Sequence, residues 1–484
     1  MKKSVFFLIA LPALALGGQK TSEEVILSLE KDAVKYEKLA FQIWDNAEVG
    51  YQETKSSEAL QNELRNAGFT VNSGVAEIPT AFVASYGEGS PVIGILAEFD
   101  ALPGLSQKAI PEKSPIVDGN PGHACGHHLF GTASTAAGIT VKEWMSANKI
   151  KGTIRVYGTP AEEGGAGKVY MVRAGLFNDV DAVLHWHPSS SNSASAASSL
   201  ANKSAKFRFY GLATHASASP HRGRSALDGV EAMNMMVNML REHVPMESRI
   251  HYIITSGGSA PNIVPDYAEV YYYIRHPETE IVKELFERVV KAAEGAATGT
   301  GTKVEYEIIH GIYNVLPNKV LAEIMHQNLS EVGGVVYDQM EREFATKIIA
   351  TYGYEVDESI VDESDDIVPF EVRTRGTGGS TDVGDISWVV PTAGLRTATW
   401  VPGTSGHSWQ AVAAGGMSIG SKGMMVAAKT ITMTAMDIFQ NPDKIKEAKA
   451  ELLERRGKEF TYQPLLGDRK PPLDYRLNTR QEEK

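Results

Sequence analysis

The chain has 484 residues, of which 59 are acidic and 47 basic, for a formal charge of −12, and 43% are hydrophobic. This composition excludes a largely disordered protein, and the length allows two or three folded domains. The acidic balance and the lack of a long basic run argue against nucleic acid or an anionic membrane surface as the partner, so we expect a small molecule.

Residues 1–18 have the features of a secretory signal peptide. Lys2 and Lys3 precede an apolar segment that ends at Leu16, and Ala13 and Ala15 supply small residues at alternate positions for a signal peptidase. The segment is shorter than the ~20 residues of a membrane-spanning helix, and no later run is long enough. We therefore expect a secreted or periplasmic protein with no membrane span after signal removal. Its single cysteine, Cys125, would then need protection from oxidation.

Residues 19–200 alternate helices and strands. Apolar periodicity predicts helices over 21–46 and 56–67 and strands over 81–86, 92–96, 152–159 and 180–186. This order favours an α/β fold with a mainly parallel sheet and functional side chains at the strand ends. Residues 189–199 are nearly all Ser, Ala and Asn, which is typical of a linker or surface crossing.

A different pattern occupies residues 201–312. Strands are expected over 203–210, 250–255, 268–275 and 303–310, with helices over 225–244 and 278–297. This βαββαβ order predicts an inserted ferredoxin-like domain. Met235, Met236 and Met239 flank the apolar stripe of its first helix, and they either widen the core contact or face a second chain.

Residues 313–440 are expected to complete the first domain, beginning with a helix over 316–333. Residues 441–484 read as a charged helix followed by a proline-rich polar tail. The segment 354–366 carries seven acidic residues in an insertion to which the sequence assigns no role beyond that of a solvated loop.

The segment from Gly122 to His128 contains one thiol and three imidazoles. This density of ligands suits a borderline-soft ion such as zinc, manganese or cobalt. Cys125 and His127 are separated by one glycine, so both can converge on one site. His123 and His128 are weaker candidates, and either could support the ligands without binding the metal.

Two adjacent carboxylates, Glu162 and Glu163, follow the strand over 152–159. Neighbouring side chains cannot easily point at one atom, so we expect one metal ligand and one proton carrier. The run from Gly164 to Lys168 is not a phosphate loop, because the glycine that such a loop needs is replaced by Glu162.

Three further histidines are candidates for the same site. His185 and His187 lie on one face of the strand near 180–186, and His187, closer to the strand end, is better placed to reach a metal. His407 lies in a Gly- and Ser-rich loop far along the chain.

Several motifs resemble those of the dinuclear-metal aminoacylase and carboxypeptidase amidohydrolases, a family that includes hippurate hydrolases and the hydrolases of auxin–amino acid conjugates. The resemblance covers residues 25–440. Within the family it is strongest to the branch that holds the B subunit of p-aminobenzoyl-glutamate hydrolase, on residues 98–104 and 380–385. The matching segments are 98–104, 125–127, 160–164, the strand ending in His187, 262–265 and 378–382.

The resemblance implies a set of metal ligands and catalytic groups. Two divalent ions, zinc, manganese or cobalt, would be held by Cys125, His127, Glu163, His187 and His407, with one of the first two bridging. Glu162 matches the general base, and Asp100 the carboxylate that orients a ligand. His128 departs from the Asp or Asn that the family usually has at this position.

The resemblance also implies that the inserted domain acts as a lid. His215 matches a lid histidine that reaches across a homodimer to the scissile carbonyl, and Asn262 and Arg275 match residues that hold the substrate's carboxylate. The expected activity is hydrolysis of N-acyl or N-aroyl amino acids, p-aminobenzoyl-glutamate-like conjugates or small dipeptides. An occupied metal site would also keep the thiolate of Cys125 unoxidised.

Two alternatives to this activity would leave different marks in the sequence. A single-zinc hydrolase would need a His-x-His-x-Asp-His or His-Glu-x-x-His run, and neither is present. A catalytically silent metal-binding protein on the same fold would be expected to lose Glu162 or a ligand, and all of these are retained.

Overall fold

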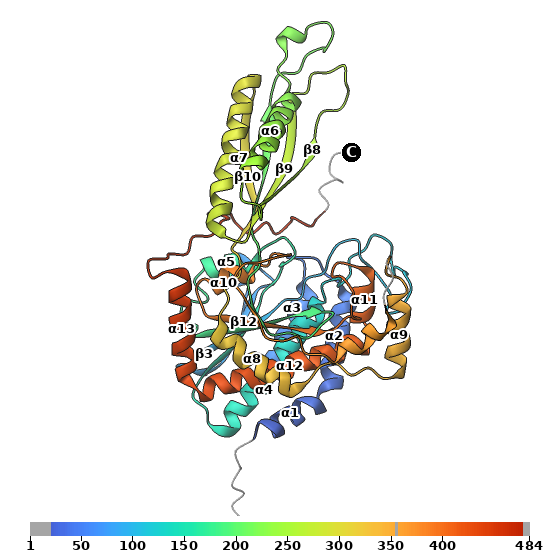
Figure 1. Cartoon of the computed structure of the whole chain (residues 1–484), viewed down its shortest axis with the longest axis vertical. Coiled ribbons are helices and arrows are strands. Elements are labelled where there is room, and N and C mark those ends of the chain that lie inside the picture. Colours follow the sequence, from blue (N-terminus) through green and yellow to red (C-terminus); the bar gives the residue numbers. More distant parts are fainter. Residues whose placement is uncertain (1–20, 354–356, 478–484) are drawn as a thin grey trace, which may run out of the picture.

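The computed structural model describes residues 21–353 and 357–477, in which a smaller domain projects from a large α/β body (Figure 1). The predicted signal peptide lies outside the described residues. Among the helices that are described, none is long and apolar enough to cross a membrane.

A six-stranded sheet forms the centre of the body, in the order β1-β2-β4-β3-β5-β12. Strands β4, β3, β5 and β12 run parallel to one another, whereas β2 is antiparallel to both of its neighbours. The sequence of β3 is apolar throughout, and the strand is buried along its whole length, as expected for a parallel strand covered on both faces. The predicted α/β class is therefore confirmed. The strands are β1 (Thr70–Ser73), β2 (Phe82–Glu88), β3 (Val92–Ala97), β4 (Gly152–Gly158), β5 (Ala182–Ser189) and β12 (Thr392–Ala398).

Helices pack around this sheet, with α4 against β3, β4 and β5 and α12 against both α4 and β12. They are α1 (Ser22–Lys31), α2 (Ala33–Asn46), α3 (Thr54–Asn66), α4 (His127–Asn148), α5 (Gly167–Arg173), α8 (Lys319–Val332), α9 (Gln339–Ile349), α10 (Val383–Ser387), α11 (Trp409–Gly415), α12 (Ser418–Gln440) and α13 (Pro442–Arg456). Short 3₁₀ helices are η1 (Val75–Glu77), η2 (Pro220–Arg222), η3 (Arg241–His243) and η4 (Glu358–Ser364).

The single helix predicted over 21–46 is in fact two helices, α1 and α2. Asp32 ends the first helix, with φ −90° and ψ 2°, and its N–H bonds to the carbonyls of Leu29 and Glu30. Both helices are amphipathic, so the hydrophobic period continues across the break and hides it from the sequence.

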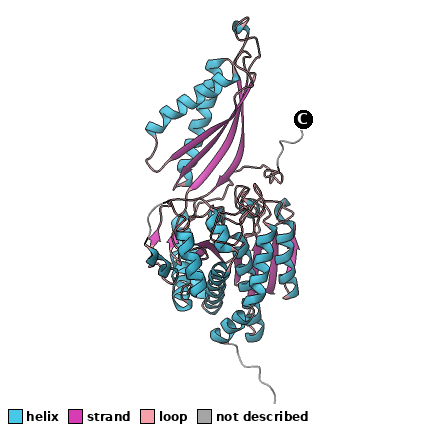
Figure 2. Ribbon diagram, turned by 90° about the vertical axis from the view of Figure 1, so that its right-hand side faces the viewer, coloured by secondary structure: helices cyan, strands magenta, loops and turns pink. Residues whose placement is uncertain are grey.

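The smaller domain, here called the lid, begins at β7 and ends at β10. It has the predicted βαββαβ order, with an antiparallel sheet in the order β10-β7-β9-β8 and both helices on one face (Figure 2). Its elements are β7 (Ala201–Tyr210), α6 (Ala226–Leu240), β8 (Arg249–Ser256), β9 (Tyr267–His276), α7 (Thr279–Thr300) and β10 (Lys303–Ile312).

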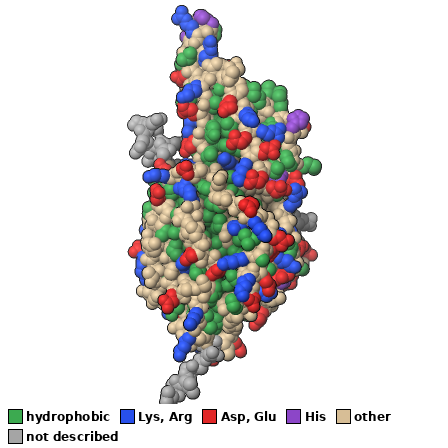
Figure 3. Space-filling view, turned by 90° about the vertical axis from the view of Figure 1, so that its left-hand side faces the viewer, with side chains coloured by type: hydrophobic (Ala, Val, Ile, Leu, Met, Phe, Trp, Pro, Cys, Tyr) green, Lys and Arg blue, Asp and Glu red, His purple; other side chains and the backbone are tan. Residues whose placement is uncertain are grey.

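The methionines that flank the buried stripe of α6 do not widen its core contact. Met235 and Met239 are each 62% exposed and Met236 is 42% exposed. Exposed hydrophobic side chains are visible on the upper, lid part of the surface in Figure 3. The helix therefore presents an apolar outer face in addition to the face that covers the lid sheet.

The segment over 189–199 is not a surface crossing, contrary to the prediction from its composition. Asn192 and Ala194 are fully buried, and the Asn192 amide donates to the carbonyls of Ser364 (2.8 Å) and Asp366 (3.0 Å). Strand β6 (Ala196–Ala197) pairs in parallel with β11 (Val372–Arg373). Small side chains serve close packing within the body here, and Ser364 and Asp366 of the acidic insertion are held through these contacts.

The C-terminal segment over 457–477 is polar in sequence but packed in the structure. Leu465 and Leu466 are buried, and Arg469 donates to the carbonyls of Ile308 and Ile309 on β10. The segment therefore contacts the lid as well as the body.

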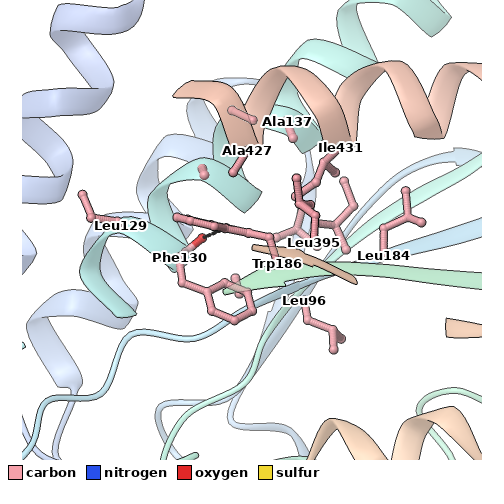
Figure 4. Close-up of a cluster of buried hydrophobic side chains, with 14 of the residues drawn as sticks. Leu96, Leu129, Phe130, Ala137, Leu184, Trp186, Leu395, Ala427 and Ile431 are labelled. Carbon is pink, nitrogen blue, oxygen red and sulfur yellow. Dashed lines mark hydrogen bonds between the residues drawn. The ribbon is translucent and has the colours of Figure 1, made fainter. Parts of the chain in front are cut away.

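Trp186 of β5 points into the core on the face of the sheet that α4 and α12 cover. It packs among side chains of α4, α12 and β12, and its indole N–H donates to the carbonyl of Phe130 at 3.1 Å (Figure 4). Because side chains alternate along a strand, His185 and His187 must point to the opposite face. The core thus fixes the direction in which these histidines project.

Candidate active site

The candidate site lies where the parallel strands end. Asp100 follows β3, Glu162 and Glu163 follow β4, and His187 lies near the end of β5. Cys125 immediately precedes α4. The carboxyl ends of parallel strands meet at one edge of a sheet, so residues far apart in the sequence come together there.

Cys125, His127 and His187 form one group that could hold a metal ion, since their donor atoms all lie within 4.8 Å of one another. The Cys125 Sγ lies 3.3 Å from His187 Nε2. Gly126 permits this arrangement because its φ is +74° and a Cβ there would lie 2.7 Å from the Cβ of Pro188.

Cys125, Glu163 and His407 form a second such group. His407 Nε2 lies 3.0 Å from Glu163 Oε1. The backbone of His407 has a left-handed φ of +59°, and its N–H donates to the carbonyl of Ala124 at 2.9 Å. A non-glycine residue held in this region is uncommon and is concentrated at functional sites. Cys125 is shared by both groups, so its thiolate could be a ligand in either of them.

Glu98, His127 and Glu162 form a third group, and sequence reasoning missed Glu98. Its Oε2 lies 3.1 Å from His127 Nε2, yet both atoms are buried without a hydrogen bond. A buried carboxylate oxygen and a ring nitrogen this close, neither with a hydrogen bond, fit a cation that both atoms would contact. Glu98 lies in the matching segment 98–104, for which the family resemblance implies a role only for Asp100.

The charges around the donor atoms also suit metal binding. Burial, followed by the nearby Glu163, raises the pKa of the Cys125 thiol, so a bound cation would be needed to stabilise its thiolate. Burial, followed by charge on His127, lowers the pKa of His187 well below its usual value and leaves a neutral ring able to bind a metal. Burial, followed by Glu98 and Glu163, raises the pKa of Glu162.

Asp100 links two of the candidate ligands. One carboxylate oxygen lies 2.9 Å from His127 Nδ1, and the other accepts the Glu163 N–H at 2.9 Å. A hydrogen bond at Nδ1 leaves the other ring nitrogen, Nε2, facing the group of donors. Asp100 therefore contacts the ring of one candidate ligand and the backbone of another.

Lys168 is a buried cation behind the site. The sequence did not indicate a role for this lysine. Its Nζ lies 2.7 Å from both Glu98 Oε1 and Asp382 Oδ1. Burial alone would lower the pKa of Lys168, but Asp382 and Glu98 raise it above its usual value. The ammonium thus stays charged and fixes Glu98 beside His127.

The other histidines of the sequence clusters have different partners. His123 contacts the carbonyl of Ile43 and His128 that of Gly415, at 3.0 and 2.9 Å, and neither belongs to a metal-binding group among the described residues. His185 lines the adjacent cavity, where its ring fills the space above Gly394.

A cavity of about 870 Å³ opens beside the donor groups, between the body and the base of the lid. Arg275 of the lid lines this cavity. His215 and Asn262 do not line it and lie on the loops that join β7 to α6 and β8 to β9. Both loops extend from the upper part of the lid in Figure 1. Within one chain, the structure therefore brings together the five expected ligands, Glu162, Asp100 and Arg275, but not His215 or Asn262.

Comparison with known proteins identifies the family. The sequence pattern of peptidase family M20/M25/M40 matches residues 94–357. The chain is 41% identical over 449 residues to the B subunit of p-aminobenzoyl-glutamate hydrolase from Escherichia coli (strain K12), covering 88% of this chain and 93% of that protein. It is 30% identical over 448 residues to the Xaa-Arg dipeptidase of Mus musculus, covering 88% and 92%.

A solved structure shares the fold. The dinuclear metal-binding peptidase of the M20 family from Bacillus subtilis matches with a TM-score of 0.59 at 18% identity, covering 85% of this chain and 99% of that one. These matches confirm the resemblance that the sequence motifs indicated. The chain therefore belongs to peptidase family M20/M25/M40, and it is a hydrolase of amide bonds.

Proposed function

We propose that the protein is a metal-dependent amidohydrolase that releases an amino acid from N-acyl or N-aroyl amino acids, such as p-aminobenzoyl-glutamate-like conjugates, or from small dipeptides. The observation that most supports this activity is that four side chains have donor atoms close to the Cys125 thiol: His127, Glu163, His187 and His407. Glu162 lies in a further group with His127. Relatives named p-aminobenzoyl-glutamate hydrolase and Xaa-Arg dipeptidase support an amide link to an amino acid as the bond cleaved.

Two divalent ions, zinc, manganese or cobalt, fit the thiolate, imidazole and carboxylate donors around Cys125. When bound, they would polarise the amide carbonyl and lower the pKa of a water molecule. Proton transfer and the positioning of the ligands depend on residues of the chain itself. Glu162 takes the proton of the attacking water and passes it to the leaving nitrogen. Asp100 holds His127 and the Glu163 backbone in place.

We also propose that the active form is a homodimer. His215 and Asn262 lie outside the cavity of their own chain, so a second copy would have to bring them to it. The exposed methionines of α6 and the exposed Ile253 and Ile254 on the edge strand β8 offer an apolar surface for that contact. The E. coli relative is named as a subunit, so a different second chain is the competing outcome.

Export is proposed on the amino-terminal sequence alone. Mass spectrometry of the protein recovered from the medium or periplasm should find a mature terminus near residue 19. Recovery of the intact amino terminus from the cytoplasm would contradict this.

The activity is tested with purified protein stripped of metal and reconstituted separately with zinc, manganese and cobalt. Elemental analysis should find about two ions per chain, and p-aminobenzoyl-glutamate, hippurate and dipeptides should be screened for release of free amino acid. Metal binding without hydrolysis of any of them would favour the silent metal-binding protein. Failure to bind metal would contradict both.

A further inference from the structure

The charged side chains that line the cavity are segregated by sign. Its acidic lining residues are Glu98, Glu162 and Glu163, and all three belong to the groups of candidate metal ligands. Most of the other lining residues are neutral, and the cationic ones are Arg275, Arg373, Arg375, Arg396 and Arg476. With cations among the glutamates, the cavity would carry net positive charge and attract an anionic ligand.

Three of these arginines are already engaged. Arg375 pairs with two glutamates of the lid, at 3.1 and 2.9 Å, and Arg373 pairs with Glu371 at 3.4 Å. Arg476 donates to the carbonyl of Glu163. Their charge contributes to the field in the cavity, but their donors are at least partly used.

Arg275 and Arg396 retain free donors. Arg275 lies over the ring of Tyr273, at 5.5 Å from its centroid, and its Nε is buried without a hydrogen-bond partner. Arg396 is exposed, and in the part of the chain that the structure describes its guanidinium has neither a hydrogen bond nor an ion pair. A guanidinium presents its N–H donors as a planar fork that matches a carboxylate, so each of the two can bind one.

Arg396 is held close to the candidate metal ligands. It lies on β12 directly beside His187 on the parallel strand β5, so the two side chains share a face about 4.8 Å apart at the backbone. Its backbone N–H and C=O both bond to Ser193, at 2.7 and 2.9 Å. The position of Arg396 is thus fixed on both sides, while its side chain reaches into the cavity.

We propose that Arg396 binds a second carboxylate of the substrate, so that the amino acid released is acidic, glutamate or aspartate. This rests on the proposed amide hydrolysis and on Arg275 as the group that holds the α-carboxylate. With the amide at the metal ligands, the side-chain carboxylate would lie one strand away, on Arg396. A released arginine or lysine is disfavoured because its cation would face an unpaired guanidinium. The E. coli relative is named for a glutamate conjugate, and the mouse relative for an Xaa-Arg dipeptide. The cavity therefore favours a glutamate conjugate as the substrate.

The test compares p-aminobenzoyl-glutamate with p-aminobenzoyl-glutamine, in which a neutral amide replaces only the side-chain carboxylate. The proteins are metal-reconstituted wild type, Arg396→Gln, Arg396→Lys and the control Arg373→Gln. Arg373 lines the same cavity but is already paired. Loss of one charge-assisted contact should lower kcat/KM of Arg396→Gln for the glutamate conjugate by about 10- to 100-fold. Turnover of the glutamine conjugate should be unchanged, and Arg396→Lys should keep part of the preference. Arg373→Gln removes one charge from the same wall but no free donor, so its loss on the glutamate conjugate should be far smaller than that of Arg396→Gln.

Equal losses on both conjugates, or no preference in the wild type, would overturn the assignment of Arg396. Calorimetric titration with free glutamate and glutamine measures binding without hydrolysis. It therefore distinguishes failure of the Arg396 assignment from failure of the proposed activity. If no amide is hydrolysed but Arg396→Gln still weakens glutamate binding selectively, the carboxylate site stands and the proposed reaction falls. If glutamate binds the wild type and Arg396→Gln equally, or not at all, the site falls as well.

Discussion

Glu162 and Glu163 are neighbours with different surroundings, and exchanging each for glutamine separates their roles. Glu163 shares a donor group with Cys125 and His407, whereas Glu162 faces Glu98 and His127. Glu162→Gln should retain metal while kcat falls by about 10²- to 10⁴-fold, because the proton carrier is lost. Glu163→Gln should lose metal as well. Elemental analysis beside steady-state kinetics checks both, and equal metal loss in the two variants would mean that the roles are assigned wrongly.

Lys168 tests the buried charges behind the site. Lys168→Met leaves Glu98 and Asp382 buried without their cation, so the free energy of unfolding should fall by about 3–5 kcal/mol. The matched control is Lys429→Met, which breaks a surface pair with Glu30 and should cost less than about 1 kcal/mol. Urea unfolding of the metal-free proteins measures both. Similar small losses would show that Lys168 does not stabilise the pair.

At the scale of elements, the C-terminal segment over 457–477 supports the loop that carries Glu163. Tyr475 OH donates to the Glu163 carbonyl at 2.9 Å, and Arg476 donates to the same oxygen. Removing both donors in Tyr475→Phe with Arg476→Ala should weaken metal affinity by about 10- to 100-fold, as loss of groups behind metal ligands does. Competition with a chelator measures this. Leu477→Ala, at an exposed position of the same segment, is the control and should bind metal as wild type.

The contact between α10 and this segment predicts a pH dependence of stability. Burial raises the pKa of Asp385 from 3.8 to about 7, although Tyr462 donates to it at 2.6 Å. Between those pH values the Asp385 carboxyl is ionised in the unfolded chain but keeps its proton in the folded protein. The free energy of unfolding therefore falls as pH rises, by at most about 4 kcal/mol in total. Below pH 3.8 and above about pH 7, the contribution of Asp385 to the free energy of unfolding no longer changes with pH.

Asp385→Asn removes this titration. Relative to the variant, the wild type should therefore lose stability between pH 5 and pH 8 in urea unfolding at each pH. A difference between the two proteins that stays constant over this range would contradict the raised pKa of Asp385.

At the scale of the whole molecule, the proposed homodimer predicts complementation between variants. Mixing His215→Ala with Glu162→Gln should restore about a quarter of wild-type activity, because half of the dimers are mixed and each has one complete site. The control mixes Glu162→Gln with Cys125→Ala; both defects lie in the body, so no complete site forms. A fully active monomer by sedimentation would refute the shared site.

The sequence alone was sufficient for the local chemistry of the site. Cys125 and His127, and likewise Glu162 and Glu163, lie close together in the chain at the ends of apolar segments, and strand ends are where a parallel sheet gathers side chains. The alternation of strands and helices was likewise enough for the α/β body and the βαββαβ lid. It was not enough for α4 or α12, because helices buried on nearly all sides lack an amphipathic period.

Tertiary structure decided everything that depends on contacts between distant segments. Asp382 is 214 positions from Lys168, and nothing local to either residue predicts that they meet in a buried ion pair. Arg396 reads as one polar residue in a strand, and only the pairing of β12 with β5 places it beside His187. The Ser- and Ala-rich segment over 189–199 looks like a linker because composition reports polarity, whereas its burial follows from the partners that the fold supplies. Sequence thus determines which groups are available, and packing determines which of them face one another.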